Sequence, residues 1–247
     1  MTALILQGRM DSSRLPGKSL LPLGGEPLIY RVMEALASVP WDLQVLACPD
    51  DCGDLFRPLA ARAGFELFTG PKDDVLARYC GAIRRHKPDR VVRATGDNPF
   101  VFADAAALLA EEAVALGADY GGYAGLPLGA GVEALGVEAL LRAEREASRP
   151  EEREHVSPYL YAHPERFLLH RPLAPPPWRD PSLRLTVDTA EDYRRAQELY
   201  RVLSPPGDAA SPVKMDPPVT LDGPARRYRG AVIREAAGEN AAPGALL

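Results

Sequence analysis

Residues 3–18 read Ala-Leu-Ile-Leu-Gln-Gly-Arg-Met-Asp-Ser-Ser-Arg-Leu-Pro-Gly-Lys, an apolar run that breaks into a loop bounded by glycines. Such a run predicts a buried parallel strand that feeds a loop, and open α/β sheets bind ligands at loops of this kind. The loop carries three cations, Arg9, Arg14 and Lys18. A guanidinium offers a planar fork and an ammonium a point charge, so the loop suits a polyphosphate. On charge alone, a solvated surface loop is an equally good interpretation.

Neither of two common phosphate-binding motifs fits this loop. Gly17-Lys18-Ser19 matches the end of a P-loop, but the first required glycine falls at Ser12, and Pro16 removes an N–H group that the phosphate cradle would use. No G-x-G-x-x-G follows the strand, so a dinucleotide fingerprint is absent.

The loop instead resembles a longer signature, Q-A-R-M-x-S-x-R-L-P-G-K, of the SpsF (spore-coat polysaccharide biosynthesis) family. That family is similar to the sugar cytidylyltransferases, including the CMP-Kdo and CMP-acylneuraminate synthetases. Gly8 stands where the family usually has Ala. Further family segments follow in the same order along the chain: Gly70 with D-V-L-x-R-Y at 74–79, V-R-x-T-G-D-x-P at 92–99, E-R-E-H-V-x-P-Y at 152–159 and R-L-T-V-D-T-x-E-D-Y at 184–193.

The resemblance implies a set of site residues. Arg9, Lys18, Asp97 and Asp188 are expected to be catalytic, with the two aspartates as metal ligands. Glu133 and His155 are expected to contact the sugar. The nucleotide-binding residues would be Gln7, Gly8, Arg9, Arg14, Lys18, Gly70, Asp74, Arg78 and Arg93.

The two expected metal ligands each have a structural alternative. Asp97 follows a predicted strand, where α/β sheets place ligands, but it also suits a turn before Pro99. Asp188 likewise ends a predicted strand, yet it could be the N-cap of the helix that follows, unless Thr189 takes that position.

The other expected site residues also have simpler explanations. Asp74 and Arg78 could form an ordinary i,i+4 helix pair. Glu133 could be an exposed strand residue, and His155 could be a histidine at the start of a solvated helix. The family pattern G-L-D-V-E-V has lost its aspartate to Gly131, which leaves the identity of the sugar open.

Composition excludes several classes of protein. The chain has 247 residues and a formal charge of −5, which argues against a nucleic-acid binder. No apolar run approaches the ~18 residues of a membrane span, and the apolar start is too short for a signal peptide, so we expect a cytoplasmic protein. Cys48, Cys52 and Cys80 suit reduced thiols, and a zinc site with His86 is disfavoured by their spacing.

Strand and helix patterns alternate four times in the first hundred residues, which predicts a doubly wound α/β sheet with right-handed crossovers. The resemblance implies the Rossmann-like mixed sheet of the nucleotide-diphospho-sugar transferases. We expect strands at 3–6, 42–47, 65–68, 90–95, 118–123 and 183–187, and helices at 28–36, 54–63, 73–86, 102–116, 137–147 and 190–203.

Two proline-rich segments interrupt this pattern. Residues 172–181 predict an extended connector that is neither helix nor interior strand. Residues 1–203 would form the nucleotidyltransferase domain, and the Pro/Ala/Gly-rich residues 204–247 an extension, partly disordered, with one short strand at 231–233. A homodimer is one option for the assembly.

We therefore expect a Mg²⁺-dependent cytidylyltransferase that joins CTP to a sugar acid or related sugar in surface polysaccharide biosynthesis and releases pyrophosphate. A glycosyltransferase with a nucleotide-sugar donor would predict a D-x-D motif, and no two aspartates of the chain stand two apart. A non-catalytic nucleotide-binding protein would not need paired metal carboxylates.

Overall fold

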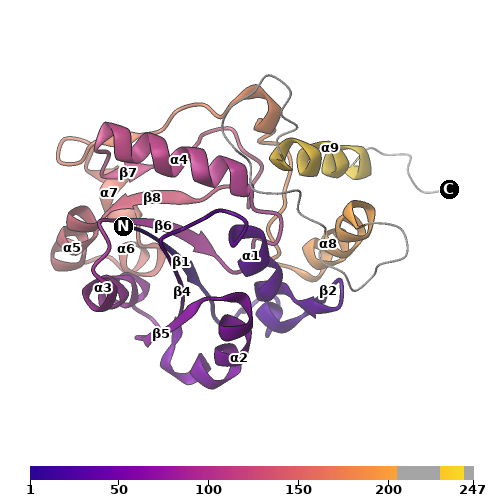
Figure 1. The fold of residues 1–247 in the computed structure, drawn as a ribbon, viewed down its shortest axis with the longest axis horizontal. Coiled ribbons are helices and arrows are strands. Elements are labelled where there is room, and N and C mark those ends of the chain that lie inside the picture. The colour runs from indigo at the N-terminus through magenta and orange to yellow at the C-terminus, as the bar shows by residue number, and fades with distance from the viewer. Residues whose placement is uncertain (205–228, 242–247) are drawn as a thin grey trace.

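A computed structural model describes residues 1–204 and 229–241. Within these ranges one seven-stranded sheet has the order β5-β4-β1-β6-β8-β7-β9 (Figure 1). The parallel half contains β1 (Thr2–Gln7), β4 (Leu43–Pro49), β5 (Glu66–Gly70) and β6 (Arg90–Thr95). The remaining strands are β7 (Tyr120–Gly121), β8 (Glu133–Gly136) and β9 (Leu169–His170), and β8 runs antiparallel to both β6 and β7. The predicted doubly wound mixed sheet is confirmed.

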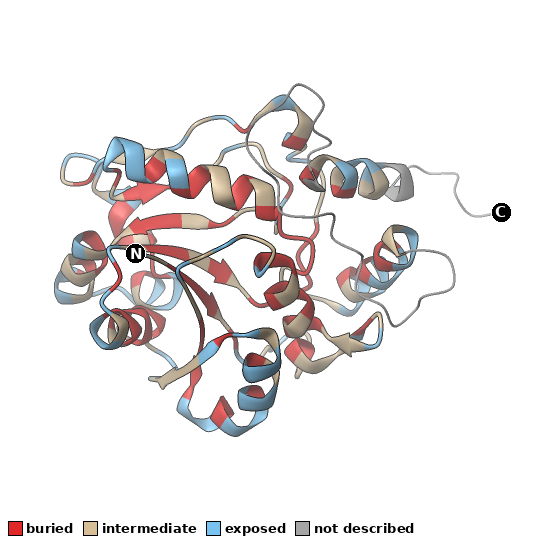
Figure 2. Ribbon diagram, in the orientation of Figure 1, coloured by how far each residue is buried: buried red, intermediate tan, exposed pale blue. Residues whose placement is uncertain are grey.

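Helices cover both faces of the sheet, and β1 shows why. Its alternate side chains enter different cores: Leu4 and Leu6 pack on one face, Ala3 and Ile5 on the other. A strand buried on both faces reads as a continuous apolar run, which is the pattern of the chain's start. Figure 2 shows the buried residues concentrated along these central strands.

The first core is covered by α1 (Leu28–Leu36), α2 (Gly53–Ala63), α4 (Ala103–Leu116) and α8 (Ala190–Leu203). The second is covered by α3 (Val75–His86), α5 (Val137–Glu146) and α7 (Pro158–Ala162), and α6 (Pro150–His155) contacts α3. The short elements are η1 (Lys18–Leu20), β2 (Pro22–Leu23), β3 (Glu26–Pro27), η2 (Asp50–Cys52) and η3 (Pro176–Trp178).

The predicted strand at 183–187 is wrong. This segment makes only an isolated bridge between Leu128 and Arg184, and its amides bond to loops: Leu185 N donates to Leu128 O at 2.7 Å and Val187 N to Asp97 O at 2.9 Å. The alternating apolar residues Leu185 and Val187 are buried in the large core that contains Leu4 and Leu6, which gives the segment the pattern of a strand without a strand partner. The strand predicted at 118–123 is shorter than expected, and the connector at 172–181 contains the single 3-10 turn η3.

The C-terminal extension also differs from the prediction. Its described part is a helix, α9 (Arg229–Ala241), and not a strand at 231–233. Gly230 N lies 3.3 Å from the carboxylate of Asp104, and a Cβ at Gly230 would fall 2.6 Å from Phe102. Ile233 is buried in the first core, so α9 packs on the domain. The predicted disorder concerns residues 205–228 and 242–247, which lie outside the described residues.

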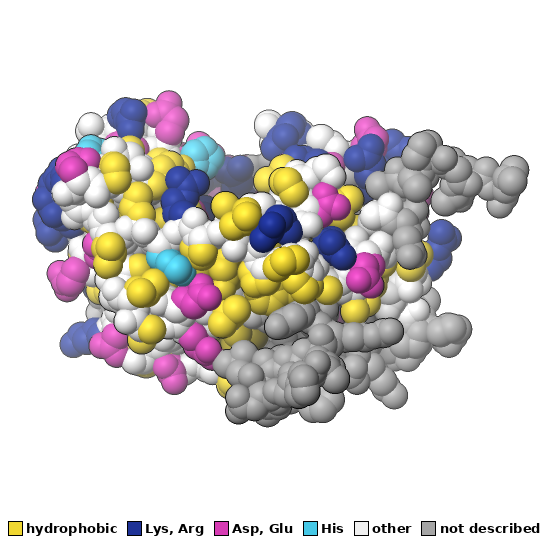
Figure 3. Space-filling view, turned by 90° about the horizontal axis from the view of Figure 1, so that it is seen from above, with side chains coloured by type: hydrophobic (Ala, Val, Ile, Leu, Met, Phe, Trp, Pro, Cys, Tyr) yellow, Lys and Arg dark blue, Asp and Glu magenta, His cyan; other side chains and the backbone are white. Residues whose placement is uncertain are grey.

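The face that carries α4 has an apolar groove of about 840 Å³, lined among others by Trp41, Leu108, Val114 and Trp178. Figure 3 shows hydrophobic side chains exposed on this side of the molecule. Across the described ranges, no helix has the length and apolar character that a membrane crossing needs.

The three cysteines are free thiols, as the sequence predicts, and all three are buried. Burial raises the pKa of the Cys48 and Cys80 thiols to about 12, which makes them poor nucleophiles and poor metal ligands. In the part of the chain that the structure describes, no group of three or more His, Cys, Asp or Glu side chains could hold a metal ion.

Candidate active site

A cleft of about 230 Å³ opens at the carboxyl ends of β1 and β6. This is the edge at which parallel α/β sheets bind ligands. Most of the predicted site residues line it together: Gln7, Gly8, Arg9, Arg14, Lys18, Arg78, Arg93, Asp97, His155 and Asp188. They come from five separate segments of the sequence, which the fold brings to one cleft.

Local hydrogen bonds shape the loop after β1. Ser19 Oγ donates to Arg9 O at 2.7 Å, and Gly17 N donates to Met10 O at 3.1 Å. Gly17 has a φ of 69°, a conformation that glycine adopts without strain. At Gly8, where the family usually has Ala, a Cβ would lie 2.5 Å from Ile29 Cδ1, so this chain's core packing favours glycine.

Lys18 does not extend freely into the cleft. Its Nζ donates to Asp97 Oδ2 at 2.8 Å, to Asp188 Oδ1 at 2.9 Å and to Val187 O at 2.8 Å. The residue is only 5% exposed. One buried ammonium therefore bridges the two predicted metal ligands.

The two loop arginines are also paired with carboxylates. Arg9 Nη1 lies 3.2 Å from Glu154 Oε1, and Arg14 Nη2 lies 3.2 Å from Asp188 Oδ1. Both guanidinium groups are more than half exposed, so these pairs contribute little to stability and exchange partners easily.

The alternative role of Asp188 as a helix N-cap is wrong. Thr189 is the N-cap of α8: its side chain accepts from Asp192 N at 3.1 Å, while Asp192 accepts from Thr189 N at 3.0 Å. The Asp188 carboxylate is left to face Lys18 and Arg184, the latter at 2.8 Å. Partial burial opposes its ionisation, but the hydrogen bond from Lys18 and the nearby cations lower its pKa.

Asp192 anchors Arg184 behind Asp188. Arg184 Nε donates to Asp192 Oδ1 at 2.9 Å. Burial opposes ionisation of this carboxyl, but the hydrogen bonds from Arg184 and the backbone lower its pKa to about 2. Asp192 therefore stays ionised and keeps Arg184 in place beside Asp188.

Asp97 and Asp188 fit a divalent cation. Because one nitrogen lies within 2.9 Å of an oxygen of each, the two carboxylates already converge on one point. Thr95 Oγ1 donates to the other oxygen of Asp97 at 2.7 Å and orients it. Mg²⁺ typically takes one or two carboxylates together with waters and phosphate oxygens, and this donor set matches that preference.

Of the three predicted nucleotide-binding residues between positions 70 and 79, Arg78 alone lines the cleft. Arg78 is buried and lines the cleft, with Nη1 donating to the carbonyls of Pro71 and Lys72. Desolvation lowers its pKa. Gly70 lets Arg78 pack closely, since a Cβ there would lie 3.2 Å from Arg78 Cγ.

Asp74 does not line the cleft. It caps α3 by accepting from Ala77 N at 2.9 Å, and its ion-pair partner within the described ranges is Arg153, at 3.0 Å from Arg153 Nε, and not Arg78. Its nucleotide-binding role stays a prediction, and its observed role is structural.

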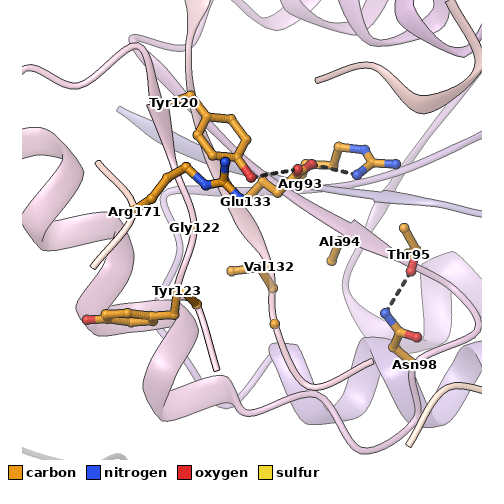
Figure 4. Close-up of a pocket in the computed structure, with 12 residues that line it drawn as sticks. Arg93, Ala94, Thr95, Asn98, Tyr120, Gly122, Tyr123, Val132, Glu133 and Arg171 are labelled. Atoms are coloured by element: carbon orange, nitrogen blue, oxygen red, sulfur yellow. Dashed lines mark hydrogen bonds and ion pairs between the residues drawn. The ribbon is translucent and has the colours of Figure 1, made fainter. Parts of the chain in front are cut away.

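Glu133 lies in a second pocket of about 270 Å³ that shares Arg93 and Thr95 with the cleft. Arg93 faces Glu133 directly across β6 and β8, and Arg93 Nη1 donates to Glu133 Oε2 at 2.6 Å (Figure 4). Tyr120 OH donates to the other oxygen at 3.1 Å, and Ser157 Oγ to the first at 2.6 Å. Three protein donors thus orient the carboxylate, which leaves few positions for a substrate donor.

Gly131 and Arg171 also line this second pocket. A Cβ at Gly131 would lie 3.2 Å from Leu126 Cδ1, a tight contact, so a larger residue here would require the Leu126 side chain to move. His155, in contrast, lines the cleft and not the pocket of Glu133. The structure therefore separates the two residues that were expected to share an acceptor site.

Sequence reasoning missed several residues that orient the site. Thr95 and Arg184 stand inside family segments and were recognisable as polar neighbours of the two aspartates. Ser157 occupies a variable position of its segment, and Tyr120 carries no local signal. Both reach Glu133 only through the tertiary fold.

The fold and the cleft define a nucleotidyltransferase. A solved structure of a cytidylyltransferase from Leptospira borgpetersenii serovar Hardjo-bovis is similar over 86% of this chain and 90% of that one, with a TM-score of 0.76 and 25% identity. The spore coat polysaccharide biosynthesis protein SpsF of Bacillus subtilis is 35% identical over 204 residues, covering 80% of this chain and 85% of that protein. A 3-deoxy-manno-octulosonate cytidylyltransferase of Anaeromyxobacter dehalogenans is 34% identical over 105 residues, covering 42% and 43%.

Residues 3–206 match the family described as Cytidylyltransferase, and the chain belongs to that family.

Proposed function

We propose that this enzyme transfers CMP from CTP to a sugar acid or related sugar of surface polysaccharide biosynthesis, with Mg²⁺ as the cofactor, and releases pyrophosphate. The observation that carries the proposal is the convergence of Asp97 and Asp188 on one cation position beside a loop of three basic residues. A glycosyltransferase and a non-catalytic binding protein have less support, since family membership and paired carboxylates both favour nucleotidyl transfer.

The reaction forms one P–O bond and breaks another. A hydroxyl of the sugar attacks the α-phosphorus of CTP and releases its proton to solvent, the bond between the α-phosphorus and the bridging oxygen of the β-phosphate breaks, and pyrophosphate leaves with the electron pair of that bond. Arg9 and Arg14 can turn from their carboxylate partners to the phosphates, because both are exposed and their pairs are weak. A divalent cation between Asp97 and Asp188 would neutralise phosphate oxygens and act as a Lewis acid. Catalysis by these residues is mostly positioning and electrostatics.

The second pocket is the proposed acceptor site. It adjoins the cleft through Arg93 and Thr95, so a sugar there lies next to the nucleotide. Its one glutamate, Glu133, is neutralised by Arg93, while Arg171 contributes a further positive charge. The lining thus favours an anionic sugar.

A pyrophosphate-release screen tests the proposal. The four nucleoside triphosphates are each combined with a panel of sugar acids and neutral sugars in the presence of Mg²⁺. We expect release only with CTP and a sugar acid. Release with UTP or GTP in place of CTP would refute the nucleotide assignment, and preference for neutral sugars would refute the acceptor assignment.

A further inference from the structure

Val156 adopts a backbone conformation that valine rarely takes. Its φ and ψ are 71° and −54°. These angles, with a hydrogen bond from Ser157 N to His155 O at 2.8 Å, define a γ-turn with positive φ, which is rare and strained. For a β-branched side chain such a φ is a genuine outlier.

The next residue is unfavourable as well. Ser157 has a φ of −93° and a ψ of −16° and directly precedes Pro158. Proline disfavours the helical region for the residue before it. Two successive disfavoured conformations persist only where the surrounding contacts hold them, and such strain clusters at functional sites.

The two side chains that flank the turn serve different parts of the site: one lines the cleft, and the other bonds to a residue of the second pocket. His155, before the turn, lines the nucleotide cleft. Ser157, after it, is fully buried and donates Oγ to Glu133 Oε2 at 2.6 Å in the second pocket. Glu133 is in turn bonded to Arg93, which lines both pockets.

The side chain of Val156 anchors the turn. It is 0% exposed and packs in the core on the α3 and α5 face of the sheet. Burial of this apolar group offsets the strained backbone, so the core clamps the turn in place. A relaxed helix end would use glycine here, and this sequence does not.

We propose that Val156 is a positioning residue: the strained γ-turn fixes His155 in the nucleotide cleft and Ser157 on Glu133, so one turn sets the relative placement of the two half-sites. The acceptor half of this inference rests on the proposed function. The part of the inference that concerns His155 and the nucleotide depends only on the cleft and on membership of the cytidylyltransferase family.

Two substitutions separate strain from burial. Val156→Ala removes the two buried γ-methyl groups and Val156→Gly removes the Cβ as well, but only glycine accepts a positive φ without cost and frees the turn. We expect V156G to melt about 2–6 °C above V156A, because alanine keeps the left-handed penalty. We also expect V156G to bind CTP about tenfold more weakly than V156A, because a freed turn no longer holds His155 in place.

Lys87 supplies the matched control. It is the other non-glycine residue with positive φ in the described ranges, at 51°, and it ends α3 outside both pockets. Lys87→Gly should likewise melt above Lys87→Ala, but the two should bind CTP equally and release pyrophosphate at equal rates.

The outcomes decide the inference. If V156G binds CTP and turns over as well as V156A, the turn has no positioning role. If V156G melts no higher than V156A, the turn stores no strain. A wild-type enzyme that binds CTP but accepts no sugar would refute the proposed acceptor, while the comparison of CTP affinities would still test the turn.

Discussion

Replacing Lys18 by methionine tests whether its ammonium occupies the position of the proposed divalent cation. Methionine nearly preserves the volume but removes the charge that bridges Asp97 and Asp188. Truncating one partner of a buried ion pair costs about 3–5 kcal/mol. Because Asp188 keeps Arg184 at 2.8 Å and Arg14 at 3.2 Å, we expect the lower end, about 3 kcal/mol.

For a protein of this size about 2–4 °C of melting temperature corresponds to 1 kcal/mol, so K18M should melt about 6–12 °C below the wild type. Mg²⁺ should then bind between the freed carboxylates without nucleotide. At 100 times its Kd, a ligand of the native state returns about 2.7 kcal/mol, which is most of the loss. The wild type should gain little from Mg²⁺ alone, because Lys18 holds the position.

The assay is thermal unfolding of wild type and K18M with and without Mg²⁺, in the absence of CTP. Lys72→Met is the control: Lys72 pairs with Asp11 at 3.2 Å but is 46% exposed, so its loss should barely change the melting temperature, and Mg²⁺ should not reverse any change. Equal stabilisation of wild type and K18M by Mg²⁺ would refute the idea that the ammonium and the metal compete.

Three further predictions follow from the site. Asp97→Asn and Asp188→Asn should each reduce turnover by orders of magnitude. Because both carboxylates serve one ion, the double variant should have about the same kcat as either single variant. A double variant whose loss of kcat in steady-state kinetics equals the product of the two single losses would refute a shared site. Glu133→Gln should leave CTP affinity unchanged in calorimetric titration but slow sugar-dependent pyrophosphate release. His155→Ala should weaken CTP binding because His155 lies in the cleft. The reverse pattern would mean that the nucleotide binds in the second pocket and the sugar in the cleft. The pKa of Asp192 is about 2 in the folded protein and about 3.9 in the unfolded chain, so its contribution to stability is present above pH 4 and is lost as the pH falls from about 4 to 2. Denaturant titrations of Asp192→Asn should therefore show a free energy of unfolding that changes less with pH over this window. The same pH dependence in wild type and variant would contradict the role given to Asp192.

Local sequence patterns predicted most helices and strands of the domain, because the residues that determine each of them lie within or next to that element. The helix at residues 28–36 begins and ends where predicted, after Pro27 and with apolar residues at helical spacing. The apolar run of β1 is continuous because both faces of that strand are buried. Once the strands are parallel, their carboxyl ends meet at one edge, and this brings Gln7 and Thr95 into the same cleft.

The failures arise where the partner of a segment is distant in sequence. Residues 183–187 have the alternation of a strand, but Leu128 and Asp97 receive their hydrogen bonds, and neither belongs to a strand. Val232 and Ile233 resemble a short strand, yet they are flanked by good helix formers, and the helix is fixed by Asp104, which lies 126 residues from Gly230 in sequence.

The chemistry of Glu133 could not be read from its neighbours in sequence either. Its three donors, Arg93, Tyr120 and Ser157, are 40, 13 and 24 residues away. Arg93 reaches it only because β8 inserts antiparallel beside β6, with these two residues in register. The sequence pattern therefore identifies Glu133, but only the fold shows that protein side chains donate the hydrogen bonds to its carboxylate.

The charges of the free site explain why a cation-rich loop is stable in this acidic protein. Lys18, Arg9 and Arg14 each have a carboxylate partner before any phosphate arrives, so the loop folds without three unpaired charges in close proximity. Binding a triphosphate is then an exchange, in which phosphate oxygens replace carboxylates at the cations and the freed carboxylates become available to a divalent ion. Neither half of this exchange is favourable alone, because a metal without phosphate must displace Lys18, and a phosphate without metal leaves Asp97 without its cation and Asp188 with Arg184 alone. The geometry therefore favours entry of the metal and the nucleotide together, and K18M should uncouple the two.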